Sequence, residues 1–105
     1  MKKINSSIPP VPKGLSAAAR RWWKSLHSEY ELVTPDQLLV LESGLQSYDR
    51  WQQARALVDE NGTTLMDRFG QRKLNPDVLV ERDSRLSMLR SFKALGLDIV
   101  PDETR

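Results

Sequence analysis

The sequence of 105 residues predicts a mainly α-helical protein, with a short first helix and two long helices joined by a small β-hairpin. Apolar side chains recur every three or four residues along most of the chain, which is the periodicity of amphipathic helices. Residues that favour a helix N-cap stand at Ser16, Thr34 and Asn75. Glycines that can end the two long helices stand at Gly62 and Gly96.

The first helix is expected to begin after Ser16 and to end near Tyr30. Three alanines follow the cap, and alanine is the strongest helix former. Trp23 is expected to flank the apolar stripe of this helix. The stripe itself is expected to contain Leu15, Ala19, Trp22, Leu26 and Tyr30.

The second helix begins at a capping box, Thr34-Pro35-Asp36-Gln37, and is expected to run to about Asn61. About 27 residues at 1.5 Å per residue span about 40 Å. Gly44 inside this helix costs about 1 kcal/mol relative to alanine, and a close approach of another helix would compensate. Two apolar faces indicate burial on more than one side: Leu38, Leu41, Leu45 and Tyr48, and then Trp51, Ala54, Leu57 and Val58.

The β-hairpin is expected at about residues 63–74, because two short segments flank a turn that ends in Gly70. The third helix starts with Asn75 as its N-cap and Pro76 at its first position, where the missing N–H costs nothing. It is expected to run to about Leu95.

The chain is expected to have three parts. Residues 1–14 form a basic arm, which three prolines favour in an extended conformation, mobile or laid along a neighbour. Residues 15–97 form a helical oligomerisation domain, and residues 98–105 form a short C-terminal tail. Apolar residues make up 39% of the chain, so its own core is modest and self-association is expected to complete it.

The sequence contains no candidate for catalysis. With no cysteine and His27 as the one histidine, it offers no Cys-based or His-rich metal site. No P-loop and no nucleophile–base pair is present. The prediction is therefore a protein that is not an enzyme and has no cofactor or metal. No signal peptide and no membrane span is expected.

Charge is distributed unevenly. Residues 1–30 carry six basic residues and one acidic residue. Residues 31–67 carry two basic and seven acidic residues, and residues 68–105 carry eight basic and six acidic residues. One interpretation is that this segregation is ordinary surface charge. The other is that the basic segment 1–30 faces phosphate and the acidic segment 31–67 faces a basic neighbour. On the second interpretation DNA would contact Lys2, Lys3, Lys13, Arg20, Arg21 and Lys24, joined by Arg82, Arg85 and Arg90.

The tryptophans either stack on bases or belong to the core or a subunit contact, and their helical spacing favours the second interpretation. The predicted core or oligomer contacts are Trp22, Trp23, Leu38, Leu41, Leu45, Tyr48 and Trp51.

Taken in order, several weak motifs resemble one family of tailed-bacteriophage terminase small subunits. The motifs are Pro9-x-x-Pro12, Leu15-Ser16 with Trp23, Leu32-Val33-Thr34, Tyr48-Asp49-Arg50-Trp51, Gly62, Gly70, Asn75-Pro76 and Leu95-Gly96-Leu97 with Pro101. The resemblance extends from about Pro9 to Pro101.

The resemblance implies a helical protomer that forms a ring, commonly of about eight to ten subunits. It implies a phage or prophage protein of the host bacterial cytoplasm that recognises double-stranded viral DNA and regulates the large terminase subunit, which carries the ATPase and nuclease. The chain is short for the family and lacks a separate helix-turn-helix domain, so the way it selects DNA stays open. Two alternatives are a dimeric helical DNA-binding regulator and a structural interaction module.

Overall fold

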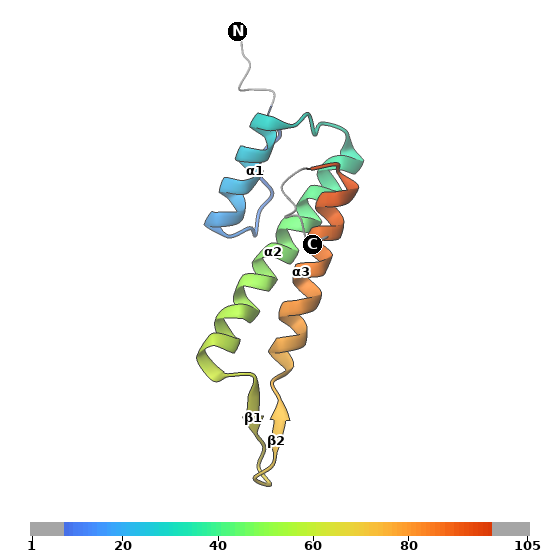
Figure 1. The fold of residues 1–105 in the computed structure, drawn as a ribbon. Coiled ribbons are helices and arrows are strands. Elements are labelled where there is room, and N and C mark those ends of the chain that lie inside the picture. Colours follow the sequence, from blue (N-terminus) through green and yellow to red (C-terminus); the bar gives the residue numbers. More distant parts are fainter. Residues whose placement is uncertain (1–7, 98–105) are drawn as a thin grey trace.

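The computed structural model describes residues 8–97, so Lys2, Lys3 and the tail predicted at 98–105 lie outside the described residues. The two long helices lie side by side and antiparallel, and the hairpin extends from one end of the pair, as Figure 1 shows. The first helix packs against the other end. The elements are α1 (Ala17–Glu29), α2 (Pro35–Asn61), β1 (Thr64–Met66), β2 (Arg72–Leu74) and α3 (Pro76–Ala94). The predicted mainly α-helical fold with its antiparallel hairpin is therefore confirmed.

Each helix begins at the cap that the sequence predicts. The Ser16 hydroxyl accepts from the Ala19 N–H at 3.0 Å, and the Asn75 side chain accepts from the Asp77 N–H at 3.0 Å. Thr34 and Gln37 make both halves of the capping box. A hydrogen bond with the Thr34 side chain is the main reason that the pKa of the Asp36 carboxyl lies below its ordinary value. The charged carboxylate thus favours the folded state, and this contribution is lost as pH falls through the lowered pKa.

The hydrophobic core lies at the α1 end of the molecule, between α1, the first half of α2 and the last turns of α3. Trp23 is the largest side chain in it and is 2% exposed, whereas Trp22 is 41% exposed. The predicted stripe was therefore wrong about which tryptophan faces inward within the protomer. The core contains Leu15, Ala19, Trp23, Leu26, Leu32, Leu41, Leu45, Met88, Phe92 and Leu97.

The segment before α1 packs on its own chain. The Trp23 indole Nε1–H donates to the Pro9 carbonyl at 3.0 Å, and Val11 packs against the core. Ser16 joins α1 to α2, because its backbone N–H and its hydroxyl donate to the two carboxylate oxygens of Asp49 at 2.9 and 2.5 Å. The described part of the predicted arm, residues 8–14, thus contacts the protomer's own core.

Gly44 lies at a close approach of α2 and α3. A Cβ added there would come within 3.0 Å of Phe92 Cε1 and of Ser91 Cβ. The close helix approach that would compensate for this glycine is therefore present. Further along the same contact the buried residues are small, Ser47, Ala54 and Ser84, which keeps the two helices close.

We expect Gly44→Leu to lower the free energy of unfolding by about 1–3 kcal/mol, because the added side chain forces α2 and α3 apart. Chemical denaturation at fixed protein concentration measures this change. Ser43→Leu is the matched control, since Ser43 is exposed on the same helix. Equal stability of the two variants would contradict the importance of the close approach.

Candidate nucleic-acid and subunit interfaces

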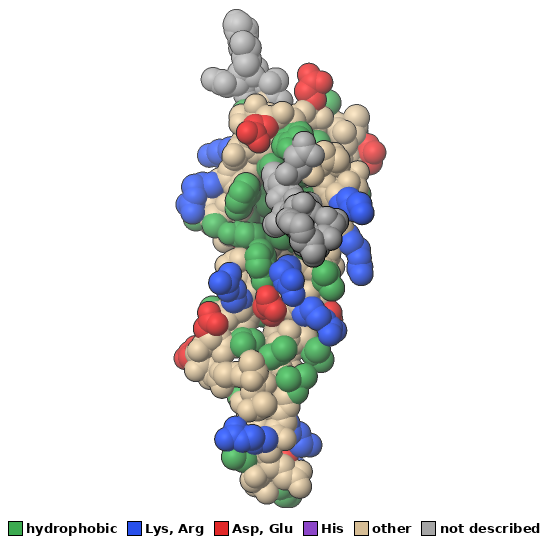
Figure 2. Space-filling model, in the orientation of Figure 1, with side chains coloured by type: hydrophobic (Ala, Val, Ile, Leu, Met, Phe, Trp, Pro, Cys, Tyr) green, Lys and Arg blue, Asp and Glu red, His purple; other side chains and the backbone are tan. Residues whose placement is uncertain are grey.

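The outer face of α1 is basic. Ser16 fixes the start of this helix, and the core residues Ala19, Trp23 and Leu26 hold its inner face. Three cations then point outward, Arg20, Arg21 and Lys24, and all three are exposed. Lys and Arg side chains are visible along this edge in Figure 2.

None of these three cations has an acidic partner within residues 8–97. The one polar contact among them is the Arg20 Nη1–H donating to the Leu15 carbonyl at 3.4 Å. Lys13, also predicted to contact DNA, is exposed just before this helix. Cations that no described carboxylate neutralises are available to phosphate, so these three residues form an exposed basic surface.

The cations predicted on α3 divide into two kinds. Arg82 lies 3.1 Å from Asp83, and Arg85 Nε lies 3.6 Å from the Glu81 carboxylate. Arg90 is exposed and has no acidic partner within the described chain. An anion would therefore compete with neighbouring carboxylates at Arg82 and Arg85 but not at Arg90.

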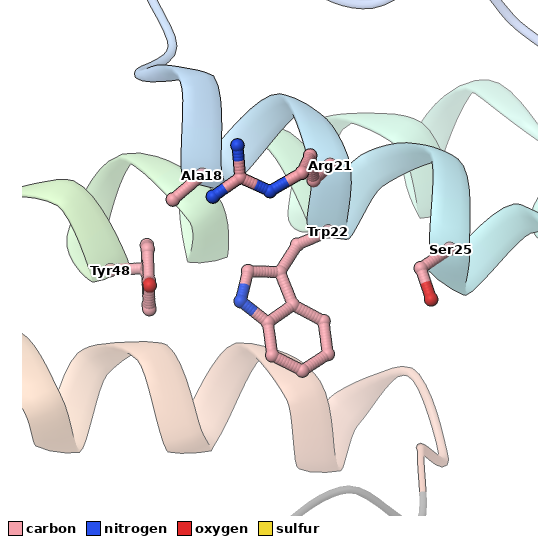
Figure 3. Close-up of a pocket in the computed structure, with 5 residues that line it drawn as sticks. All are labelled: Ala18, Arg21, Trp22, Ser25 and Tyr48. Atoms are coloured by element: carbon pink, nitrogen blue, oxygen red, sulfur yellow. The ribbon is translucent and has the colours of Figure 1, made fainter.

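A shallow pocket of about 300 Å³ lies between α1 and α2 beside this basic face. Figure 3 shows the Trp22 indole pointing away from α1, with Tyr48 of α2 beside it across the pocket. The Arg21 guanidinium lies over the same side of α1. The pocket thus has aromatic walls and a cation at its rim, and it is lined by Ala18, Arg21, Trp22, Ser25 and Tyr48.

The predicted core or oligomer contacts differ in burial. Trp23, Leu41 and Leu45 are buried in the protomer, and Leu38, Tyr48 and Trp51 are half-buried against its core, whereas Trp22 is exposed. The structure therefore brings six of the seven together around one core. A role of Trp22 at a subunit contact stays a prediction.

Trp51 joins α2 to α3 through a polar contact. Its Nε1–H donates to the Glu81 carboxylate at 2.7 Å, and Glu81 also pairs with Arg85. The Tyr48 ring lies edge-on to the Trp51 ring at 6.0 Å between centroids. This cluster fixes how the two long helices lie beside one another between the core and the hairpin.

Several large apolar side chains are exposed on the described surface. They occur at both ends of the molecule, on the hairpin and along α3. Where such side chains adjoin one another, they are typical of surfaces that bind a partner, whereas single exposed residues are common. The exposed large residues are Trp22, Val33, Leu39, Leu57, Leu65, Met66, Phe69, Leu74, Leu79, Val80 and Leu86.

Within residues 8–97, no group of three or more metal-ligating side chains is placed to hold a metal ion. The two ring nitrogens of His27 lie 2.8 and 3.1 Å from the carbonyl oxygens of Trp23 and Leu32, which is a structural role at the end of α1. None of the described helices has the length and apolar character needed to cross a membrane.

The fold and this surface define a class, a small helical protein with a basic face and exposed apolar side chains. The family model described as phage terminase, small subunit, matches residues 19–102. The chain belongs to the phage terminase small subunit family. No curated protein and no solved structure matches the chain.

Proposed function

We propose that this protein is the non-catalytic small subunit of a phage DNA-packaging terminase, which assembles into a ring and engages double-stranded viral DNA. The match of residues 19–102 to the family carries the proposal. The surface of α1 supports it, because three exposed cations that have no acidic partner among residues 8–97 suit a phosphate backbone. The dimeric-regulator and structural-module alternatives have no comparable support.

The character of the surface supports the proposed assembly into a closed ring. Asp59 and Glu60 are exposed at the C-terminal end of α2 and have no cationic partner among the described residues. The C-terminal end of a helix carries a partial negative charge, so acidic side chains there are electrostatically unfavourable. A basic residue of a neighbouring subunit would offset this repulsion. Contacts between unlike surfaces of identical subunits make a ring when the rotation closes.

The proposed ring acts as an adaptor. DNA engaged by the ring is brought to the large terminase subunit, which supplies the ATPase and nuclease, and the ring regulates that subunit. The small subunit contributes no P-loop and no reaction centre to this step. The proposed place of action is the cytoplasm of the host bacterium.

Native mass spectrometry with and without duplex DNA tests the proposal. We expect one dominant species of about eight to ten times the 12.0 kDa chain mass, and a further species that contains one duplex. A dimer that binds DNA would support the regulator alternative instead. A monomer with no DNA-bound species at tens of micromolar protein and moderate salt would contradict the proposal.

A further inference from the structure

The β-hairpin projects from the α2–α3 pair, at the opposite end from α1 (Figure 1). All six strand residues are exposed, and the strands pair with Leu65 opposite Lys73. Phe69 at the turn is 76% exposed. A two-stranded hairpin alone is marginally stable in water, so an exposed one is expected to be completed by a partner.

The turn of this hairpin is held in one conformation by Asp67. One of its carboxylate oxygens accepts from the N–H groups of Phe69 and Gln71 at 2.8 and 2.9 Å. The Asp67 backbone N–H donates to the Gln71 carbonyl at 2.8 Å, and the Asp67 carbonyl accepts from the Gly70 N–H at 3.0 Å. Phe69 is therefore presented to solvent by an ordered turn, and little conformational entropy is lost when it binds a partner.

The hairpin is also basic. The guanidinium carbon of Arg68 lies 5.2 Å from the centre of the Phe69 ring, and Arg72 Nη1–H donates to the Thr64 hydroxyl at 3.1 Å. Lys73 lies 3.7 Å from Asp67, the one acid of the hairpin. Arg68 and Arg72 have no acidic partner among the residues that the structure describes. Lys and Arg side chains are visible on both sides of the hairpin in Figure 2.

We propose that this hairpin is a second DNA-contacting element, separate from the α1 face, with a duplex as its partner. A two-stranded β-ribbon fits the major groove of B-DNA, and arginine contacts both phosphates and guanine edges. In the same groove the exposed Phe69 ring is placed to contact a thymine methyl group, which is the apolar feature of the major groove. The proposal rests on the proposed function, because it requires that the assembled protein binds DNA.

The charge of the hairpin favours nucleic acid over a protein partner. Three cations accompany one acid, and the exposed aromatic ring carries a guanidinium over its face. A purely apolar protein contact would leave Arg68 and Arg72 desolvated without acidic partners, which is costly. The experiment must still distinguish a DNA contact from a contact between subunits.

The test compares three variants of the full chain in their assembled form. Arg68→Gln with Arg72→Gln removes the two unpaired charges and keeps polar side chains. Phe69→Ala removes the aromatic ring. Arg50→Gln with Arg55→Gln is the matched control, because these two exposed arginines on α2 also have no acidic partner in the described chain.

Fluorescence anisotropy with a duplex of about 30 base pairs gives affinity as a function of salt. We expect the hairpin double variant to bind at least about tenfold more weakly, with a log–log salt slope shallower by about one to two. Phe69→Ala should bind about fivefold more weakly with an unchanged slope, because the lost apolar contact is not ionic. The control should stay within about twofold of wild type.

Three outcomes would overturn the inference. One is a hairpin double variant that binds like the control, and another is a control that weakens binding as much as the hairpin variants do. The third is loss of the wild-type assembly mass in the hairpin variants, which would make the hairpin a subunit contact. Wild-type protein that binds no duplex would overturn the proposed function as well, so the two failures are distinguishable.

Discussion

Trp23→Ala is expected to lower the free energy of unfolding by about 3–5 kcal/mol, which is enough to unfold a chain with a modest core. The side chain is 2% exposed and contacts the residues that hold α1 against α2 and α3. The substitution also removes the donor to the Pro9 carbonyl and so releases the segment before α1. Thermal and chemical denaturation at fixed protein concentration measure the loss, because assembly contributes to apparent stability.

Trp22→Ala is the matched control for this prediction. It removes the same side chain one residue earlier, from a position that is 41% exposed in the protomer. We expect the protomer fold to be retained, with any effect confined to the mass of the assembly. A Trp22→Ala protein less stable than Trp23→Ala would show that the two rings have been assigned to the wrong faces.

The two tryptophans also show where sequence reasoning reached its limit. At 100° per residue, both rings lie at the edges of the apolar stripe of α1, so periodicity alone does not decide between them. The decision comes from tertiary contacts, since Trp23 has both the core and the Pro9 carbonyl as partners. No local pattern around Pro9 predicts that contact.

Features that depend on local chemistry could be predicted closely. Ser16, Thr34 and Asn75 each begin a helix, and Gly62 and Gly96 end the long ones with positive φ. These outcomes follow from side-chain capping and from the conformational freedom of glycine, which act within a few residues.

The candidate site was predictable in part, because the position of a side chain on a helix also follows from local sequence. Arg20, Arg21 and Lys24 lie outward because they are opposite the stripe of a correctly predicted helix. The pairing of Arg85 with Glu81 also follows from helical spacing, but the donation from Trp51 to Glu81 needs the α2–α3 register. The basic hairpin was not among the predicted DNA contacts, because sequence analysis gave its turn a purely structural role.

Replacing Arg20, Arg21 and Lys24 together by alanine is expected to weaken duplex binding at least about a hundredfold in moderate salt. Each subunit of an assembly presents the same three cations, so one variant removes many phosphate contacts from one bound duplex. Each lost contact also flattens the log–log dependence of affinity on salt by about 0.9. Fluorescence anisotropy across a salt series measures affinity and slope together.

Two controls keep this result specific to charge. Arg20→Lys with Arg21→Lys preserves the positive charge and should retain most of the affinity, since lysine also contacts phosphate. Trp22 lies beside these cations, so unchanged tryptophan fluorescence and unchanged native mass must accompany the alanine variant. A triple variant that binds duplex with wild-type affinity and slope would make the α1 face a solvated surface. The DNA contact would then lie on the hairpin or on α3, where Arg90 also has no acidic partner among the described residues.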